Sequence, residues 1–233
     1  MKDLFGNALF DLYENPDQVE LLLHNEFSEP DILDLEGYFF TAENFTELEL
    51  YALDLCRGKT LDIGSAAGRH VLELQKRGFE VTGLDKSKKC QELMELRGVA
   101  HLIKNDIFDC DELTYDTWIM LMNGIGLVRD LKGLKFFLSF ARNKIRDGGQ
   151  LIFDSSSIDY LKEQFGYDPK GYIGELNYQY EYRGQFGPWF KWLYVDQLTL
   201  RKIANECGWF CQIVFENMQG QYLAVLRKLD NKM

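Results

Sequence analysis

The sequence lacks any apolar run as long as the roughly 18 residues that a membrane-spanning helix needs. Its first residues carry charges where a secretory signal would have an apolar core. No internal repeat or low-complexity tract interrupts the 233 residues. We therefore expect a cytoplasmic protein with no membrane partner.

Cysteine and histidine are scarce and scattered. The five cysteines include no CxxC pair, and the three histidines lie far apart in the chain. Reduced thiols are therefore expected in place of disulfides or zinc ligands. The sequence predicts no metal site.

Basic residues are almost missing from the first 59 residues, which hold 14 acids and three bases. The remaining 23 acids and 23 bases cancel, so this segment carries the whole net charge of −11. A nucleic-acid partner needs the opposite sign around its site, so none is expected. The acids are interpreted either as a solvated helix surface or as an acidic cover that favours a neutral or cationic small substrate.

A glycine-rich turn between two apolar segments is the most informative stretch. The run TLDIGSAAGRHVLEL at 60–74 predicts a strand, a glycine loop and a helix, and EVTGLDKS at 80–87 predicts a second strand that ends at Asp85. Gly64 permits a sharp turn, and Gly68 opens a helix whose free N–H groups face the same place. A carboxylate at the tip of the next strand is typical of folds that bind the ribose of an adenosine-bearing cofactor.

The glycine spacing separates two cofactor classes. A dinucleotide fingerprint has its third glycine five positions after the first, and here that position is Arg69. A pyrophosphate site is therefore disfavoured. The pattern DIGSAAG at 62–68 resembles motif I of the class I S-adenosylmethionine-dependent methyltransferases, with Ala66 in place of the usual glycine.

Later segments follow the order of that family. HLIKND at 101–106 predicts a short strand, TWIMLMNGIG at 117–126 a buried one, and DGGQLIFDSSS at 147–157 a glycine turn with another buried strand. Continuous apolar strands separated by amphipathic helices indicate a parallel sheet covered on both faces. The resemblance covers about residues 58–157. It implies a Rossmann-like α/β fold with a seven-stranded, mostly parallel sheet and an antiparallel C-terminal hairpin.

The resemblance also implies the cofactor, S-adenosyl-L-methionine, and the residues that bind it. It implies that Asp85 binds the ribose hydroxyls and that Asp106 faces the adenine amino group. Asn123 is the analogue of the family's segment between cofactor and substrate. The expected cofactor-binding residues are Asp62, Gly64, Ser65, Ala66, Gly68, Asp85, Lys86, Asp106, Ile107 and Asn123.

The terminal regions resemble the family only loosely. Residues 1–50 are expected to form an N-terminal helical lid, with a second helix starting near Asp17, and residues 51–233 the cofactor-binding domain. Two-residue alternation at about 175–195 predicts an added antiparallel hairpin. Its aromatic side chains are interpreted either as the wall of a substrate pocket or as a dimer interface, so the protein is expected to be a monomer or a homodimer.

The predicted function is S-adenosylmethionine-dependent methyl transfer to a small-molecule acceptor. Positioning of the nucleophile supplies most of the acceleration in such chemistry, so the catalytic residue is unknown from the sequence. Where the nucleophile must lose a proton, Tyr38, His70 and Asp154 are the candidate bases. The alternatives are a non-catalytic protein that binds S-adenosylmethionine and, less favoured because of Arg69, an NAD-dependent oxidoreductase.

Overall fold

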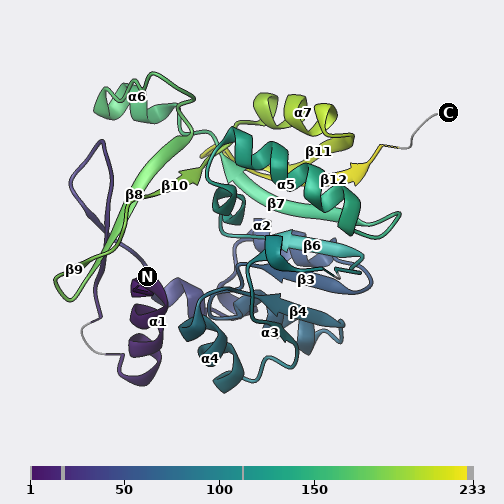
Figure 1. Cartoon of the computed structure of the whole chain (residues 1–233), viewed down its shortest axis with the longest axis horizontal. Helices are drawn as coiled ribbons and strands as arrows, with labels where there is room; N and C mark the ends of the chain where they lie inside the picture. The colour runs from purple at the N-terminus through teal and green to yellow at the C-terminus, as the bar shows by residue number, and fades with distance from the viewer. Residues whose placement is uncertain (1, 17–18, 112, 230–233) are drawn as a thin grey trace.

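The computed structural model describes residues 2–16, 19–111 and 113–229, which form two sheets (Figure 1). The larger sheet has seven strands in the order β11-β12-β7-β6-β3-β4-β5. Their bounds are β3 Thr60–Ile63, β4 Val81–Leu84, β5 Leu102–Ile103, β6 Thr117–Met120, β7 Gln150–Ser156, β11 Trp209–Glu216 and β12 Gln221–Lys228. Strands β3 to β7 are parallel, whereas β12 runs antiparallel to both of its neighbours, β7 and β11. This arrangement confirms the expected Rossmann-like sheet with its C-terminal hairpin.

Helices cover both faces of the larger sheet. Helices α2 (Glu47–Asp54) and α3 (Arg69–Lys76) bury their apolar sides on one face, together with Met94 of α4 (Lys88–Leu96). Helices α5 (Leu131–Lys144) and α7 (Gln197–Glu206) cover the other face. Both faces of the central strands are therefore apolar, which explains the unbroken apolar runs in the sequence.

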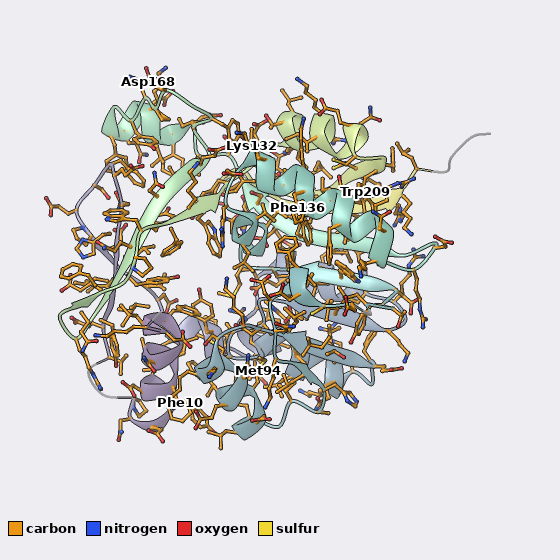
Figure 2. All side chains as sticks on the ribbon, viewed as in Figure 1. Phe10, Met94, Lys132, Phe136, Asp168 and Trp209 are labelled. Carbon is orange, nitrogen blue, oxygen red and sulfur yellow. The ribbon has the colours of Figure 1, made fainter. Side chains whose placement is uncertain are left out.

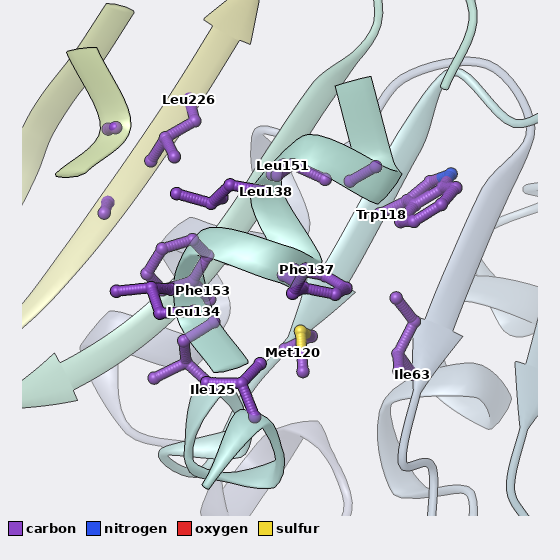
Figure 3. Close-up of a cluster of buried hydrophobic side chains, with 14 of the residues drawn as sticks. Ile63, Trp118, Met120, Ile125, Leu134, Phe137, Leu138, Leu151, Phe153 and Leu226 are labelled. Carbon is purple, nitrogen blue, oxygen red and sulfur yellow. The ribbon is translucent and has the colours of Figure 1, made fainter. Parts of the chain in front are cut away.

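The core under α5 shows how the sequence pattern is used. Leu134, Leu138 and Ala141 recur at helical spacing and point onto the sheet, as expected from the sequence. In Figure 3, Leu134 and Leu138 lie against Phe153 and Leu151 of β7. Each fully buried large apolar side chain stabilises the fold by roughly 1.5–3 kcal/mol. This packing fixes the ends of β6 and β7, where polar residues follow.

The smaller sheet is antiparallel and joins the two terminal regions. It runs in the order β10-β8-β1-β2, with β9 also paired to β8. Its strands are β1 Leu21–His24, β2 Asp31–Ile32, β8 Glu175–Tyr182, β9 Gln185–Phe186 and β10 Phe190–Leu193. The pairing of β8 with β10 confirms the added hairpin. Figure 1 shows this sheet beside the larger one, at the left of the view.

The N-terminal segment differs from its expected form. Helix α1 (Leu4–Glu14) is present, but the second helix expected to start near Asp17 is wrong. Asp17 lies outside the described residues, and Leu21–His24 form a strand hydrogen-bonded to β8. The three consecutive leucines have no helical period, and pairing with β8 satisfies their backbone groups.

In the part of the chain that the structure describes, the remaining elements are four short 3₁₀ helices and one short α-helix. They are η1 Glu36–Phe39, η2 Ala42–Asn44, η3 Ile107–Asp109, η4 Gly124–Val128 and α6 Tyr160–Phe165. None of the helices in the described residues has the length and apolar character needed to cross a membrane.

Candidate functional site

The loop between β3 and α3 is built from left-handed backbone. The φ angles are +75° at Gly64, +49° at Ala66 and +77° at Gly68, which is the N-cap of α3. Ser65 fixes the loop, since its Oγ donates to the Asp62 carbonyl at 2.8 Å and accepts from the Leu84 N–H at 2.9 Å. The loop is therefore held tightly against the ends of β3 and β4.

Ala66 adopts a backbone conformation that favours glycine, which explains why the family uses glycine there. The left-handed region costs an L-residue roughly 1–2 kcal/mol, and the Ala66 methyl is buried. We expect Ala66→Gly to change the free energy of unfolding by less than about 1 kcal/mol, because relief of strain offsets lost burial and greater chain entropy. Affinity for S-adenosylhomocysteine, measured by calorimetry, should stay the same or rise slightly.

The neighbouring residue provides the control for this substitution. Ala67 is also buried but is not among the residues with a positive φ. Ala67→Gly should therefore lower the stability without relieving strain. Equal losses of stability in the two variants would contradict the proposed strain at Ala66.

Asp85 lies at the carboxyl end of β4 and holds the glycine loop. Its Oδ2 accepts from the Ala66 N–H at 2.9 Å, and its Oδ1 accepts from the Ser87 N–H at 2.8 Å. Burial raises the pKa of this carboxyl, against the effect of the two backbone hydrogen bonds. Each oxygen retains a further lone pair for a ligand. The sequence did not indicate that Asp85 would also anchor the loop.

The residues expected at the adenine lie next to Asp85. Lys86 is exposed, and its Nζ lies 3.5 Å from Oδ2 of Asp106. Asp106 caps η3 by accepting from the Phe108 N–H at 3.2 Å, while Ile107 is buried. The structure therefore brings together Asp85, Lys86, Asp106 and Ile107, which lie on two different loops.

Asn123 has the features of a ligand-binding residue. It follows β6 in a left-handed conformation with φ of +57°, and its N–H donates to the Asp154 carboxylate at 2.9 Å. Its side-chain Nδ2 and Oδ1 are buried and form no hydrogen bond of good geometry with the described residues, although the Tyr194 hydroxyl is a neighbour. Buried amides are normally paired, so this side chain lacks a partner that a ligand would supply.

A buried ionic cluster beside the loop was not expected from the sequence. Oε1 of Glu49 on α2 lies 2.5 Å from Nη2 of Arg69 and 2.8 Å from Nε2 of His70, both on α3. Arg69 also donates to the Gly37 carbonyl and lies over the Phe45 ring. Burial alone would raise the pKa of Glu49, but His70, Thr46 and Arg69 together lower it to about 2.

Loss of this carboxylate should destabilise the fold strongly. Glu49→Ala leaves the buried Arg69 without a counter-ion, and breaking a buried pair in this way costs about 3–5 kcal/mol. We expect a loss of this size in urea denaturation at pH 7. The matched control is Glu47→Ala, which removes an exposed acid from the same helical turn and should have little effect.

The same carboxylate predicts acid sensitivity. Its folded-state pKa of about 2 lies below the ordinary value of 4.5. Its contribution to stability is therefore present above pH 4.5 and is lost as the pH falls towards 2. A Glu49→Ala variant whose stability follows the same acid profile as the wild type would contradict this assignment.

A small pocket opens where the N-terminal segment crosses the ends of β6 and β7. Its volume is about 270 Å³. Its lining residues are Asp34, Gly37, Phe40, Asn44, Thr46, Glu49, Arg69, Met122, Asp154 and Gln221. Residues from opposite ends of the sequence therefore enclose one space beside the glycine loop.

Two buried carboxyls lie at the strand ends near this space. Burial raises the pKa of Asp62, at the end of β3, to about 6, and raises the pKa of Asp154, in β7, to about 6. Asp154 is fully buried and also accepts from Gln221 Nε2 at 3.0 Å. Buried carboxyls with a raised pKa are typical of residues that hold ligands or move protons.

Leu127 and Trp192 approach the site. Trp192 is one of the hairpin aromatic residues interpreted from the sequence as a pocket wall or a dimer interface, whereas Leu127 was not selected. An added Cβ at Gly64 would lie 2.5 Å from Cδ1 of Leu127, so Gly64 is needed for this approach as well as for its φ angle. An added Cβ at Gly126 would collide with the Trp192 indole. The β8–β10 hairpin therefore packs against η4, next to Asn123.

The chain was compared with known proteins. No protein-family model matches it, and no curated protein matches it significantly. Among solved structures it is similar to an S-adenosylmethionine-dependent methyltransferase from Bacteroides fragilis in complex with S-adenosyl-L-homocysteine. The two are 30% identical, with a TM-score of 0.89 over 98% of this chain and 95% of the other. The chain belongs to the S-adenosylmethionine-dependent methyltransferases.

More distant structures share the fold. The sugar N-methyltransferase KedS8 from Streptoalloteichus is 15% identical over 87% of this chain and 96% of its own, with a TM-score of 0.58. The PH0226 protein from Pyrococcus horikoshii is 20% identical over 83% of this chain and 98% of its own, with a TM-score of 0.60. Membership of this family confirms two predictions, that the protein is a methyltransferase and that its cofactor is S-adenosyl-L-methionine.

Proposed function

We propose that this methyltransferase acts on a small neutral or cationic molecule. The pocket of about 270 Å³ carries the proposal, because the chain's own N-terminal residues enclose it at the ends of β6 and β7. A space of this size suits a small molecule rather than a polymer. The expectation of a cytoplasmic monomer or homodimer stays a prediction.

The cofactor-binding residues proposed from the sequence fit S-adenosyl-L-methionine. The loop has the left-handed glycines of a cofactor-binding turn, and Asp85 and Asp106 follow the neighbouring strands β4 and β5. The buried amide of Asn123, beside the Tyr194 hydroxyl, fits a role between cofactor and acceptor. When bound, the cofactor supplies an electrophilic methyl group, so the protein's main task is to position the acceptor and exclude water.

The charge of the pocket favours a neutral or cationic acceptor. Three carboxylates line it, those of Asp34, Glu49 and Asp154, against the single guanidinium of Arg69. Glu49 and Arg69 pair with each other, so the remaining field is negative. Such a field attracts a cation and repels an anion such as a nucleic acid.

Asp154 is the candidate best placed to accept a proton from the acceptor. It lines the pocket, and its pKa of about 6 leaves it ionised at neutral pH and able to take a proton there. Burial raises the pKa of Tyr38 to about 12, so that hydroxyl stays protonated. His70 has its Nε2 held by Glu49.

Two measurements test the proposal. Calorimetric titration should show binding of S-adenosylmethionine and S-adenosylhomocysteine and no binding of NAD. Methyl transfer should then be measured over matched sets of small amines, alcohols and carboxylates, with transfer RNA included. Transfer confined to carboxylates or to RNA would contradict the proposed acceptor class, and absence of binding by either adenosyl ligand would contradict the cofactor site.

A further inference from the structure

One carboxylate at the start of the chain joins the first turns of two helices. Oδ1 of Asp3 accepts from the Gly6 N–H at 3.1 Å and so caps α1. Its Oδ2 accepts from the Ser87 hydroxyl at 2.6 Å, and the Lys89 N–H of α4 lies 3.5 Å away. The positive ends of two helix dipoles thus offset the charge of Asp3.

Gly6 makes this approach sterically possible. A Cβ added there would collide with Oγ of Ser87 and with both carboxylate oxygens of Asp3. Gly6 is also buried within α1, where glycine is otherwise unfavourable. Any side chain at position 6 would therefore push the first turn of α1 away from α4.

The hydrogen bonds continue from Asp3 to the glycine loop. Ser87 caps α4 by accepting from the Cys90 N–H at 3.0 Å, and its own N–H donates to Oδ1 of Asp85 at 2.8 Å. The other oxygen of Asp85 accepts from the Ala66 N–H at 2.9 Å. A continuous path thus runs from the N-terminal helix through Ser87 and Asp85 to the loop.

Apolar packing surrounds this path. Leu4, Ala8 and Leu9 of α1 are buried in one cluster with Cys90 and Leu93 of α4 and with Ala66 and Ala67 of the loop. Nζ of Lys89 lies 3.9 Å from the centre of the Phe10 ring. Figure 2 shows α1, which carries Phe10, beside α4, which carries Met94. The junction is therefore part of the folded core.

We propose that Asp3 is a positioning residue for the cofactor. It holds Ser87, and Ser87 in turn fixes the orientation of the Asp85 carboxylate and the start of α4. This inference rests on the proposed function in one respect, the assignment of the ribose to Asp85. The N-terminal helix then contributes to cofactor affinity without contacting the cofactor itself.

The experiment measures S-adenosylhomocysteine affinity by calorimetry, with thermal unfolding recorded for every variant. Asp3→Ala should weaken binding about 3- to 10-fold, the change expected for loss of one ordinary hydrogen bond's contribution. Ser87→Ala should have a similar effect, and the double variant should lose little more because both residues act through one link. Asp3→Asn and Ser87→Thr keep the acceptor and the hydroxyl, and should restore most of the affinity.

The matched control is Asp11→Ala. Asp11 lies on the same helix and carries the same charge, but its carboxylate accepts from the Tyr182 hydroxyl and pairs with Arg183, away from Ser87. This variant should bind the ligand like the wild type. An effect of charge alone would weaken binding equally in Asp3→Ala and Asp11→Ala and would overturn the proposal.

Three outcomes separate this proposal from the assignment of the site. Wild-type protein that does not bind S-adenosylhomocysteine contradicts the cofactor site itself. Wild-type binding that Asp85→Ala weakens, together with unchanged affinity in Asp3→Ala and Ser87→Ala, overturns the positioning role and leaves the site intact. A lower melting temperature with unchanged affinity would likewise assign Asp3 a structural role only. If Asp3→Ala does not fold, the affinities of Ser87→Ala and Ser87→Thr test the same positioning role.

Discussion

Removal of residues 1–40 is expected to give a chain that aggregates. The deletion removes α1 and β1, whose Leu9, Phe10 and Leu21 are buried, and it exposes the apolar surface around Leu93 that they cover. It also leaves the edge of β8 unpaired, because β1 occupies that edge. Exposed apolar surface and a free strand edge both promote association.

The measurement is the yield of monomeric protein in size-exclusion chromatography, followed by S-adenosylhomocysteine binding. Deletion of the first two residues serves as the control, since Lys2 is exposed. The lid interpretation predicts a soluble core that still binds the ligand after the longer deletion. That result would contradict the view that residues 1–40 are a layer of the folded core, whereas loss of soluble protein would contradict a detachable lid.

The larger sheet could be predicted from the sequence because its signals are local. Unbroken apolar runs such as TWIM at 117–120 become central parallel strands, and the glycine positions around 64–68 set the loop. Ala66 shows the strength of that pattern, since the alanine takes up the left-handed backbone that the motif requires. Turn geometry here is decided within a few residues.

Within the smaller sheet, the pairing of β1 with β8 could not be predicted because it is not local, unlike the pairing of β8 with β10. Leu21–His24 is a short apolar run, which periodicity alone does not assign to helix or strand. Its partner, Tyr182, lies about 160 positions later in the chain. Contacts between residues this far apart in the sequence determine the structure of β1, and neither local propensity nor turn residues predict such contacts.

The ionic cluster was missed for a similar reason. Arg69 was selected in the sequence only as the residue that replaces a third glycine, yet the structure places it against Glu49, 20 positions earlier. Whether a charge is buried and paired depends on how helices pack, which composition does not show. The acids of the N-terminal segment illustrate this, because Asp3, Asp11 and Glu49 each make defined contacts rather than forming only a solvated surface.

Asp85→Ala is expected to weaken S-adenosylhomocysteine binding by about 10- to 150-fold. A hydrogen bond to a charged group contributes roughly 1.5–3 kcal/mol, which corresponds to that range. The structure adds a second cause, because the substitution also releases the N–H groups of Ala66 and Ser87 that shape the loop. Asp85→Asn separates the two causes, since its amide oxygen keeps one acceptor and its charge is lost.

The pH dependence provides an independent test of the same carboxylate. Burial raises the pKa of Asp85 above the ordinary value of 3.8, and a protonated carboxyl accepts hydrogen bonds poorly. Wild-type affinity should therefore decline on the acid side at a pH higher than an ordinary aspartate would give, and this decline should be absent in Asp85→Ala. The fold is monitored by circular dichroism at each pH. Unchanged affinity in a folded Asp85→Ala protein would contradict the ribose assignment, and the cofactor would then have to be placed by the loop alone.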